Sequence, residues 1–245
     1  MSAPTDNKSP VAVITGASRG IGRAIAKRLA TRGYRVAVSS RNIQSCEAVV
    51  EEIQDSGAVA KAYSCDVRSE HDVKKLMDRV MLDWGALNVV ISNAGVSGGN
   101  SRIIDFPTDK WNDLVATHLT GSFFVARETI RNMSQLANND SIVRHLIFMS
   151  SLAAVRAHAN KSAYTAVKGG IASLATAIVE EVRKDRINVS TIFPGSVATD
   201  ILKASGDGAG KPMRPESVAD AVDYITSIED NALVQRVVLE RREEV

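Results

Sequence analysis

The stretch Val11-Ala-Val-Ile-Thr-Gly-Ala-Ser-Arg-Gly-Ile-Gly22 decides the fold. Its first five residues form a short apolar run, which is typical of a strand buried on both faces of a parallel sheet. Glycines follow at once, and apolar residues then recur at helical spacing until Gly33 ends the pattern. A second apolar run covers residues 35–39. A strand, a turn, a helix and a second strand within about 30 residues predict a βαβ unit and a parallel sheet.

The glycine-rich turn of this unit is a candidate nucleotide site. Glycines let the backbone approach a ligand closely, and the N-terminus of the following helix favours a phosphate group. A glycine-rich turn can also be no more than a tight connection. Its place between a buried strand and an amphipathic helix favours dinucleotide binding. The predicted contacts here are Gly16, Ser18, Arg19, Gly20, Ile21 and Gly22.

The end of the second strand indicates which dinucleotide is bound. NAD-specific enzymes commonly have an acidic residue here, which binds the ribose hydroxyl groups. This chain has Ser40 and Arg41 instead, and Arg19 lies in the glycine-rich turn. Two guanidinium groups near the ribose suit a 2′-phosphate, although both arginines can also be solvated surface residues. The sequence therefore predicts NADP(H) as the cofactor.

The rest of the chain continues to alternate between strands and helices. Strands are predicted over residues 58–64, 87–92, 144–149, 188–193 and 234–239. Helices are predicted over residues 43–57, 69–85, 108–136 (as two consecutive helices), 163–184 and 215–228. Core positions predicted within residues 108–136 are Trp111, Leu114, Val115, Leu119, Phe123, Phe124 and Val125. The alternation predicts a doubly wound α/β sheet of about seven parallel strands, with helices on both faces and the ligand beyond the carboxyl ends of the strands.

Composition limits the kind of protein. With 245 residues, 44% of them hydrophobic, the chain fits a polar tail over residues 1–10 and one α/β domain over residues 11–245. A net charge of +2 gives no sign of a nucleic-acid surface or a polybasic membrane anchor. No apolar run approaches the ~20 residues of a membrane span, and the tail is not a signal peptide. Two cysteines suit the cytoplasm or another reducing compartment, and the four histidines show no metal-ligand spacing.

Tyr164 and Lys168 are a candidate acid–base pair. Positions four apart lie on one face of a helix, and no other tyrosine in the chain has a lysine at this spacing. A free tyrosine titrates near pH 10. A lysine ammonium about 5 Å away favours the phenolate by ~3 kcal/mol at an effective dielectric constant of ~20, which makes the phenol a usable catalyst. Alone, the pair is more readily explained as a surface helical pair.

The motifs taken together resemble the short-chain dehydrogenase/reductase family, and the likeness covers most of the chain. Within it, the chain is most similar to the 3-oxoacyl-(acyl-carrier-protein) reductases and the carbonyl reductases. Six motifs occur in the order that the family has: Thr15–Gly22, Asp66-Val67, Asn93-Ala94-Gly95, Ser151, Tyr164 with Lys168, and Pro194-Gly195.

The resemblance implies reversible hydride transfer between a nicotinamide and a small-molecule carbonyl or secondary alcohol. Ser151, 13 residues before Tyr164, would orient and polarise the carbonyl. Tyr164 would donate the proton, and Lys168 would acidify Tyr164 and hold the nicotinamide ribose. Asp66 would contact the adenine. Further cofactor contacts implied by the resemblance are Val67, Asn93, Ala94, Gly95, Pro194, Gly195, Val197 and Thr199. Residues 200–214 would form a lid over the substrate, and the chain is expected to form a homodimer or homotetramer.

The chain departs from the family pattern at three places. His118 replaces an asparagine that supports a water linked to the catalytic lysine; an imidazole can also donate and accept, so it either preserves the relay or is structural. Ser92 replaces an asparagine before Asn93, and the last residues lack the frequent Asp-Gly-Gly.

Two other classes of function stay open. One is a cofactor-binding regulatory or scaffold protein, and the other is a nucleotide-sugar epimerase, expected less because such enzymes carry a longer C-terminal region.

Overall fold

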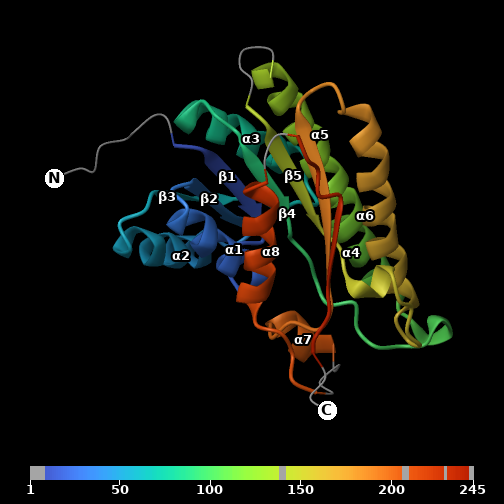
Figure 1. Cartoon of the computed structure of the whole chain (residues 1–245). Coiled ribbons are helices and arrows are strands. Elements are labelled where there is room, and N and C mark those ends of the chain that lie inside the picture. The colour runs from blue at the N-terminus through green and yellow to red at the C-terminus, as the bar shows by residue number, and fades with distance from the viewer. Residues whose placement is uncertain (1–8, 138–141, 206–209, 229–230, 243–245) are drawn as a thin grey trace.

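The computed structural model describes residues 9–137, 142–205, 210–228 and 231–242 (Figure 1). Seven strands form one sheet in the order β3-β2-β1-β4-β5-β6-β7, and every neighbouring pair is parallel. The predicted doubly wound sheet is therefore confirmed. The strands are β1 (Val11–Thr15), β2 (Arg35–Ser40), β3 (Ala60–Ser64), β4 (Val89–Ser92), β5 (Arg144–Met149), β6 (Ile187–Pro194) and β7 (Arg236–Leu239).

Two layers of helices cover the sheet (Figure 1). On one face lie α1 (Gly20–Thr31), α2 (Ile43–Asp55) and α8 (Pro215–Thr226). On the other face lie α3 (Glu70–Trp84), α5 (Gly121–Ala137) and α6 (Ser162–Glu181). The remaining helical segments are α4 (Thr108–Leu114), a π-helical turn (Val115–Thr120) that leads into α5, α7 (Asp200–Ser205), and single 3₁₀ turns at Ile103–Asp105 and Leu152–Ala154.

The apolar runs of the central strands are explained by burial on both faces. Every residue of β1 and of β5 is buried. Side chains of a strand alternate between its two faces, so Ala12 and Ile14 pack beneath α1 and α8, whereas Val11 and Val13 pack beneath α3 and α5. These central strands are the rigid support of the cleft described below.

The ends of the helices follow from local chemistry. At the start of α3, the Ser69 hydroxyl accepts a hydrogen bond from the Asp72 N–H at 3.2 Å and donates to the Asp72 carboxylate at 3.1 Å. At its end, Gly85 adopts a left-handed conformation with φ of 66°. Both the predicted start and the predicted end of this helix are confirmed.

Two predicted core residues are wrong. Trp111 is 39% exposed and Phe123 is 44% exposed. Trp111 lies in α4, a short helix of which only Leu114 is buried. Phe123 lies on the outer side of α5, two residues before the buried Val125, so the helical period points its ring away from the core. Phe123 packs instead against the Arg127 guanidinium, 5.1 Å from its ring centre.

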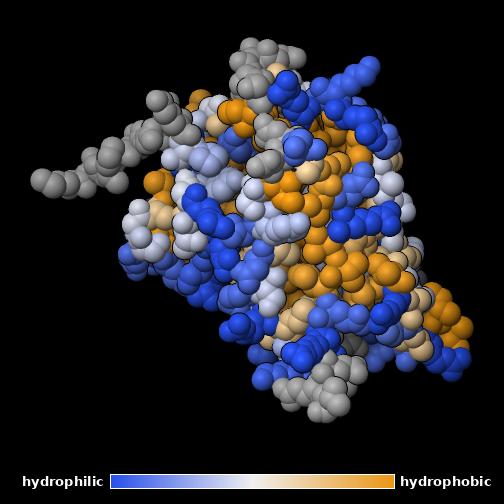
Figure 2. Space-filling model, in the orientation of Figure 1, coloured by the Kyte–Doolittle hydropathy of each residue, from blue (hydrophilic) through white to orange (hydrophobic). Residues whose placement is uncertain are grey.

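Some predictions concern segments that the structure describes only in part. Residues 1–8 of the predicted tail and residues 206–209 of the predicted lid lie outside the described residues. Within the described ranges, no helix is long and apolar enough to span a membrane. Hydrophobic side chains gather beside α8, over the edge of the sheet that β7 forms (Figure 2), where Val238 is 51% exposed.

Replacing Gly22 tests how tightly the glycine-rich turn is packed. A Cβ atom at Gly22 would lie 2.4 Å from the Gly16 carbonyl oxygen and 2.6 Å from the Asn93 side-chain nitrogen. We expect Gly22→Ala to lower the free energy of unfolding by about 1–3 kcal/mol, because overpacking must shift the backbone. Gly169→Ala is the control, since a Cβ there meets no atom within 4 Å in the interior of α6. It should stabilise by about 0.5–1 kcal/mol. Equal urea unfolding curves for the two variants would contradict this.

Candidate active site

A cleft of about 960 Å³ opens at the carboxyl ends of the central strands. All of the predicted catalytic and cofactor residues line it, so the fold brings together motifs that are spread over most of the chain. Those from the first half of the chain are Gly16, Ser18, Arg19, Gly20, Ile21, Gly22, Ser40, Arg41, Asp66, Val67, Asn93, Ala94, Gly95 and His118. Those from the second half are Ser151, Tyr164, Lys168, Pro194, Gly195, Val197 and Thr199.

The glycine-rich turn brings its backbone close to the end of β4. Gly16 has a φ of +65°, and a Cβ atom there would lie 2.8 Å from the Ala94 Cα atom. The Asn93 side chain fixes the turn from below by donating hydrogen bonds to the carbonyl oxygens of Thr15, at 2.9 Å, and Gly16, at 3.2 Å. The turn leads into the N-terminus of α1. This arrangement fits the pyrophosphate of a dinucleotide.

The end of β5 holds Lys168 at two points. The Lys168 Nζ atom donates to the Met149 carbonyl oxygen at 2.9 Å, and the Ser150 hydroxyl donates to the Lys168 carbonyl oxygen at 2.9 Å. The same Nζ atom lies 5.6 Å from the centre of the Tyr164 ring. Burial lowers the pKa of Lys168 to about 7. Because Lys168 is buried, little water screens the electric field of its ammonium at Tyr164.

Ser151 follows β5 directly and caps the short turn after it. Its hydroxyl accepts from the Ala153 N–H at 3.2 Å and lies 3.5 Å from the Pro194 carbonyl oxygen. Ser151 therefore caps this turn, and its catalytic role stays a proposal. Ser151, Tyr164 and Lys168 share one end of the cleft.

His118 lies beneath this group, in the π-helical turn between α4 and α5. Its ring meets the Tyr164 ring edge-on, with centres 5.7 Å apart, and its Nε2 atom is 2.9 Å from the Val96 carbonyl oxygen. Burial lowers the pKa of His118 to about 3, and the Lys168 charge contributes. The imidazole is therefore neutral near pH 7. The Val96 N–H also lies 3.2 Å from Nε2, so the tautomer decides which of these two hydrogen bonds forms. In the tautomer whose Nε2–H donates to the Val96 carbonyl oxygen, the buried Nδ1 atom is an acceptor with no hydrogen-bond partner among the described residues.

Comparison with known proteins identifies the family. The family model described as short chain dehydrogenase matches residues 10–209. The 3-oxoacyl-(acyl-carrier-protein) reductase of Bos taurus is 33% identical over 193 residues, which cover 79% of this chain and 78% of the bovine protein. The chain belongs to the short-chain dehydrogenase family. It is an oxidoreductase of that family.

Solved structures of this family have the same fold. A metagenomic short-chain oxidoreductase in complex with NADP superimposes with a TM-score of 0.83 and 28% identity, covering 98% of this chain and 100% of that chain. A variant of the actinorhodin polyketide ketoreductase with NADPH superimposes with a TM-score of 0.86 and 25% identity, covering 97% of each chain.

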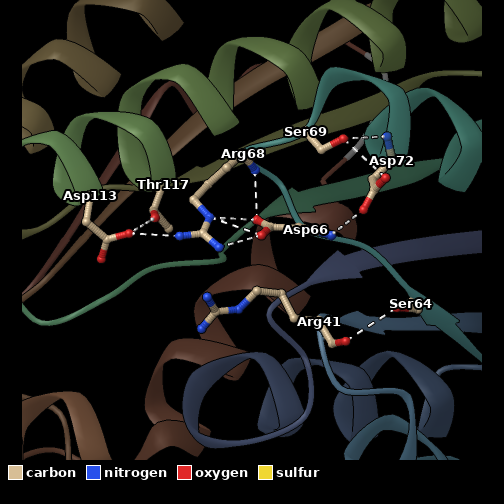
Figure 3. A network of polar contacts seen from close by, with 8 residues as sticks. All are labelled: Arg41, Ser64, Asp66, Arg68, Ser69, Asp72, Asp113 and Thr117. Atoms are coloured by element: carbon tan, nitrogen blue, oxygen red, sulfur yellow. Dashed lines mark hydrogen bonds and ion pairs between the residues drawn. The ribbon is translucent and has the colours of Figure 1, made fainter.

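The charged groups at the other end of the cleft form pairs that the sequence did not predict. Arg19 pairs with Asp200 at the start of α7 at 3.3 Å, and both side chains are more than half exposed. Asp66 pairs with Arg68, and the contact is 2.6 Å long. No described residue accepts a hydrogen bond from the exposed Arg41 guanidinium, which lies on the same side of the cleft as Asp66 and Arg68 (Figure 3).

Sequence reasoning missed several residues that line the cleft of this dehydrogenase. Arg68 was one, although its position two residues after Asp66 was a signal. The loop after β4 borders the cleft as well: a Cβ at Gly98 would lie 2.6 Å from the Tyr164 side chain, so this backbone packs directly on the tyrosine. Lys161, at the start of α6, donates to the Gly99 carbonyl oxygen at 2.7 Å and holds the loop there. No group of three His, Cys, Asp or Glu residues in the described part of the chain could hold a metal ion.

The buried His118 should make the fold sensitive to acid. Its pKa of about 3 in the folded chain is below the ordinary value of 6.5, so between these values the unfolded chain binds more protons. Stability is then lost as the pH falls from 6.5 towards 3, by up to about 1.4 kcal/mol per pH unit. His118→Asn should lack this component, whereas His71→Asn, at an exposed position of α3, should keep it. Parallel stability curves for wild type and His118→Asn between pH 6 and 4 would contradict the assignment.

Proposed function

We propose that this short-chain dehydrogenase reduces a carbonyl substrate to a secondary alcohol with NADPH. The observation that carries the proposal is the convergence of Ser151, Tyr164 and Lys168 at one end of the cleft that holds the glycine-rich turn. The bovine relative and the polyketide ketoreductase, whose names describe reduction of oxo groups, support this direction.

The chemistry would divide among three side chains and the cofactor. A bound nicotinamide supplies the hydride. The Ser151 hydroxyl donates a hydrogen bond to the carbonyl oxygen and stabilises its developing negative charge. The Tyr164 hydroxyl donates its proton to the same oxygen. Lys168, held by the Met149 carbonyl oxygen, stabilises the negative charge that remains on the tyrosine oxygen.

His118 is proposed as a positioning residue in place of the asparagine that the family has. Its neutral imidazole offers the buried Nδ1 atom as an acceptor, and its ring packs on Tyr164. A water bound at Nδ1 would link His118 to the Lys168 ammonium and allow a proton to return to the site.

Removing the Tyr164 hydroxyl tests the proposed proton donor. Tyr164→Phe should lower kcat for carbonyl reduction by ~10²–10⁴-fold, since general acid catalysis is lost. The Kd of NADPH should change little, because the ring still packs against Gly98. Initial rates with a panel of ketones and the fluorescence of bound NADPH measure the two effects. A variant that keeps more than about a tenth of wild-type kcat excludes Tyr164 as the proton donor.

Preference for NADPH depends on the charges around the ribose. Arg41 is the cation that no described carboxylate pairs with, whereas Arg19 must leave Asp200 before it can bind a 2′-phosphate. That exposed pair is worth ~0–1 kcal/mol, so a phosphate can displace Asp200. A charge-assisted hydrogen bond contributes ~1.5–3 kcal/mol, and solvent exposure favours the lower end. We therefore propose a preference of about tenfold from Arg41 alone and about a hundredfold when Arg19 also binds.

The ratio of kcat/KM for NADPH to that for NADH tests this proposal. Ser40→Asp combined with Arg41→Ala should reverse the preference, because an acid repels the phosphate and accepts from the free ribose hydroxyl. Asp200→Asn should increase the wild-type preference by freeing Arg19. Raising the salt concentration should weaken it. If wild type uses NADH as well as NADPH, the assignment of NADPH is wrong.

Self-association into a dimer or tetramer also stays a proposal. Its support is exposed apolar side chains among the described residues: Trp111 on α4, Phe123 on α5, and Val238 on the edge strand β7. Hydrophobic surface also gathers at the β7 edge of the sheet (Figure 2). An edge strand presents unpaired backbone groups that a second copy can cover.

A further inference from the structure

Arg68 joins two carboxylates across the rim of the cleft (Figure 3). Its Nε atom lies 3.0 Å from both carboxylate oxygens of Asp66, and its Nη2 atom lies 2.6 Å from one of them. Its Nη1 atom donates to Asp113, on α4, at 3.1 Å. Two carboxylates on different edges of a planar guanidinium fix both its position and its plane.

The same network nearly saturates the Asp66 carboxylate. The backbone N–H of Arg68 also donates to Asp66, at 3.0 Å, so three N–H groups of one residue bind a carboxylate that has about four acceptor positions. The Asp66 backbone N–H is held in turn by Asp72, at 3.2 Å. Asp66 is therefore fixed from two sides, with room for about one further donor, and its side chain is 27% exposed where it lines the cleft.

We propose that Arg68 is a positioning residue for base recognition: it fixes Asp66 so that the remaining acceptor position selects a purine with an exocyclic amino group. Adenine donates a hydrogen bond from that group. Hypoxanthine carries a carbonyl oxygen at the same place, which the carboxylate repels. The inference rests on the proposed function, because a dinucleotide must occupy this end of the cleft.

Arg68 is also a link between the base and the catalytic end. Asp113 accepts from the Thr117 hydroxyl at 3.5 Å, and Thr117 precedes His118 in the π-helical turn. If Arg68 only tied α4 to the loop after β3, its loss would weaken binding of every ligand in the cleft alike. Recognition of the base predicts an effect on adenosine ligands alone.

The test is displacement of fluorescent NADPH by AMP, by IMP and by reduced nicotinamide mononucleotide. Wild type should bind AMP about tenfold more tightly than IMP. Arg68→Ala should weaken the binding of AMP about tenfold and bring the ratio of AMP to IMP affinity close to one. It should leave the affinity for reduced nicotinamide mononucleotide unchanged. Asp113→Asn should shift the ratio in the same direction by roughly two- to threefold. Arg23→Ala is the matched control. Arg23 forms a salt bridge with Glu52 through two of its nitrogen atoms, outside the cleft, and the two side chains are 45% and 36% exposed.

The possible results separate this inference from the proposed function. An Arg68→Ala variant that keeps the wild-type ratio of AMP to IMP affinity overturns the role of Arg68 and leaves the proposed function intact. Equal weakening of all three ligands also overturns it. If Arg68→Ala does not fold, Arg68→Lys should show an intermediate ratio, and an unchanged ratio in both Arg68→Lys and Asp113→Asn overturns the inference. Failure of wild type to bind NADPH overturns the proposed function itself.

Discussion

The Thr15 hydroxyl holds together the two strand ends between which the cleft opens. It donates to the Ile91 carbonyl oxygen at 3.2 Å and accepts from the N–H groups of Asn93, at 3.0 Å, and Ala94, at 3.2 Å. After β1 the chain turns to one face of the sheet, and after β4 it turns to the other. The backbone hydrogen bonds between these two strands therefore cannot continue past their ends. One buried side chain supplies these bonds instead, and it thereby sets the distance between the glycine-rich turn and Asn93.

The end of the cleft that is proposed for catalysis depends on a second constraint, the contact between β5 and α6. The Lys168 Nζ atom donates to the Met149 carbonyl oxygen of β5, and the Ser150 hydroxyl donates to the Lys168 carbonyl oxygen of α6. A shift of the helix along the strand would break both hydrogen bonds. Tyr164 lies one helical turn before Lys168 and moves with it. The loop at Gly98 packs directly against the tyrosine side chain.

Much of the site could be predicted because parallel strands end at the same edge of a sheet. Ser151 and Asn93 follow buried strands, so their meeting follows from strand order alone. The pairs at the rim could not be predicted, since Arg19 binds Asp200, which is 181 residues away, and the partner depends on where α7 lies. The exposure of Phe123 was missed because its hydrophobic character was given more weight than its position on the helix.

The state of His118 likewise depends on burial and not on residue type. An asparagine has no charge, whereas an exposed histidine titrates close to neutral pH. A second cation beside Lys168 would oppose the charge on which the proposed proton transfer depends. Burial removes this conflict, because with 2% exposure and a pKa of about 3 the imidazole stays neutral wherever Lys168 is partly protonated. The replacement of asparagine by histidine therefore changes the hydrogen bonds of the site without changing its charge.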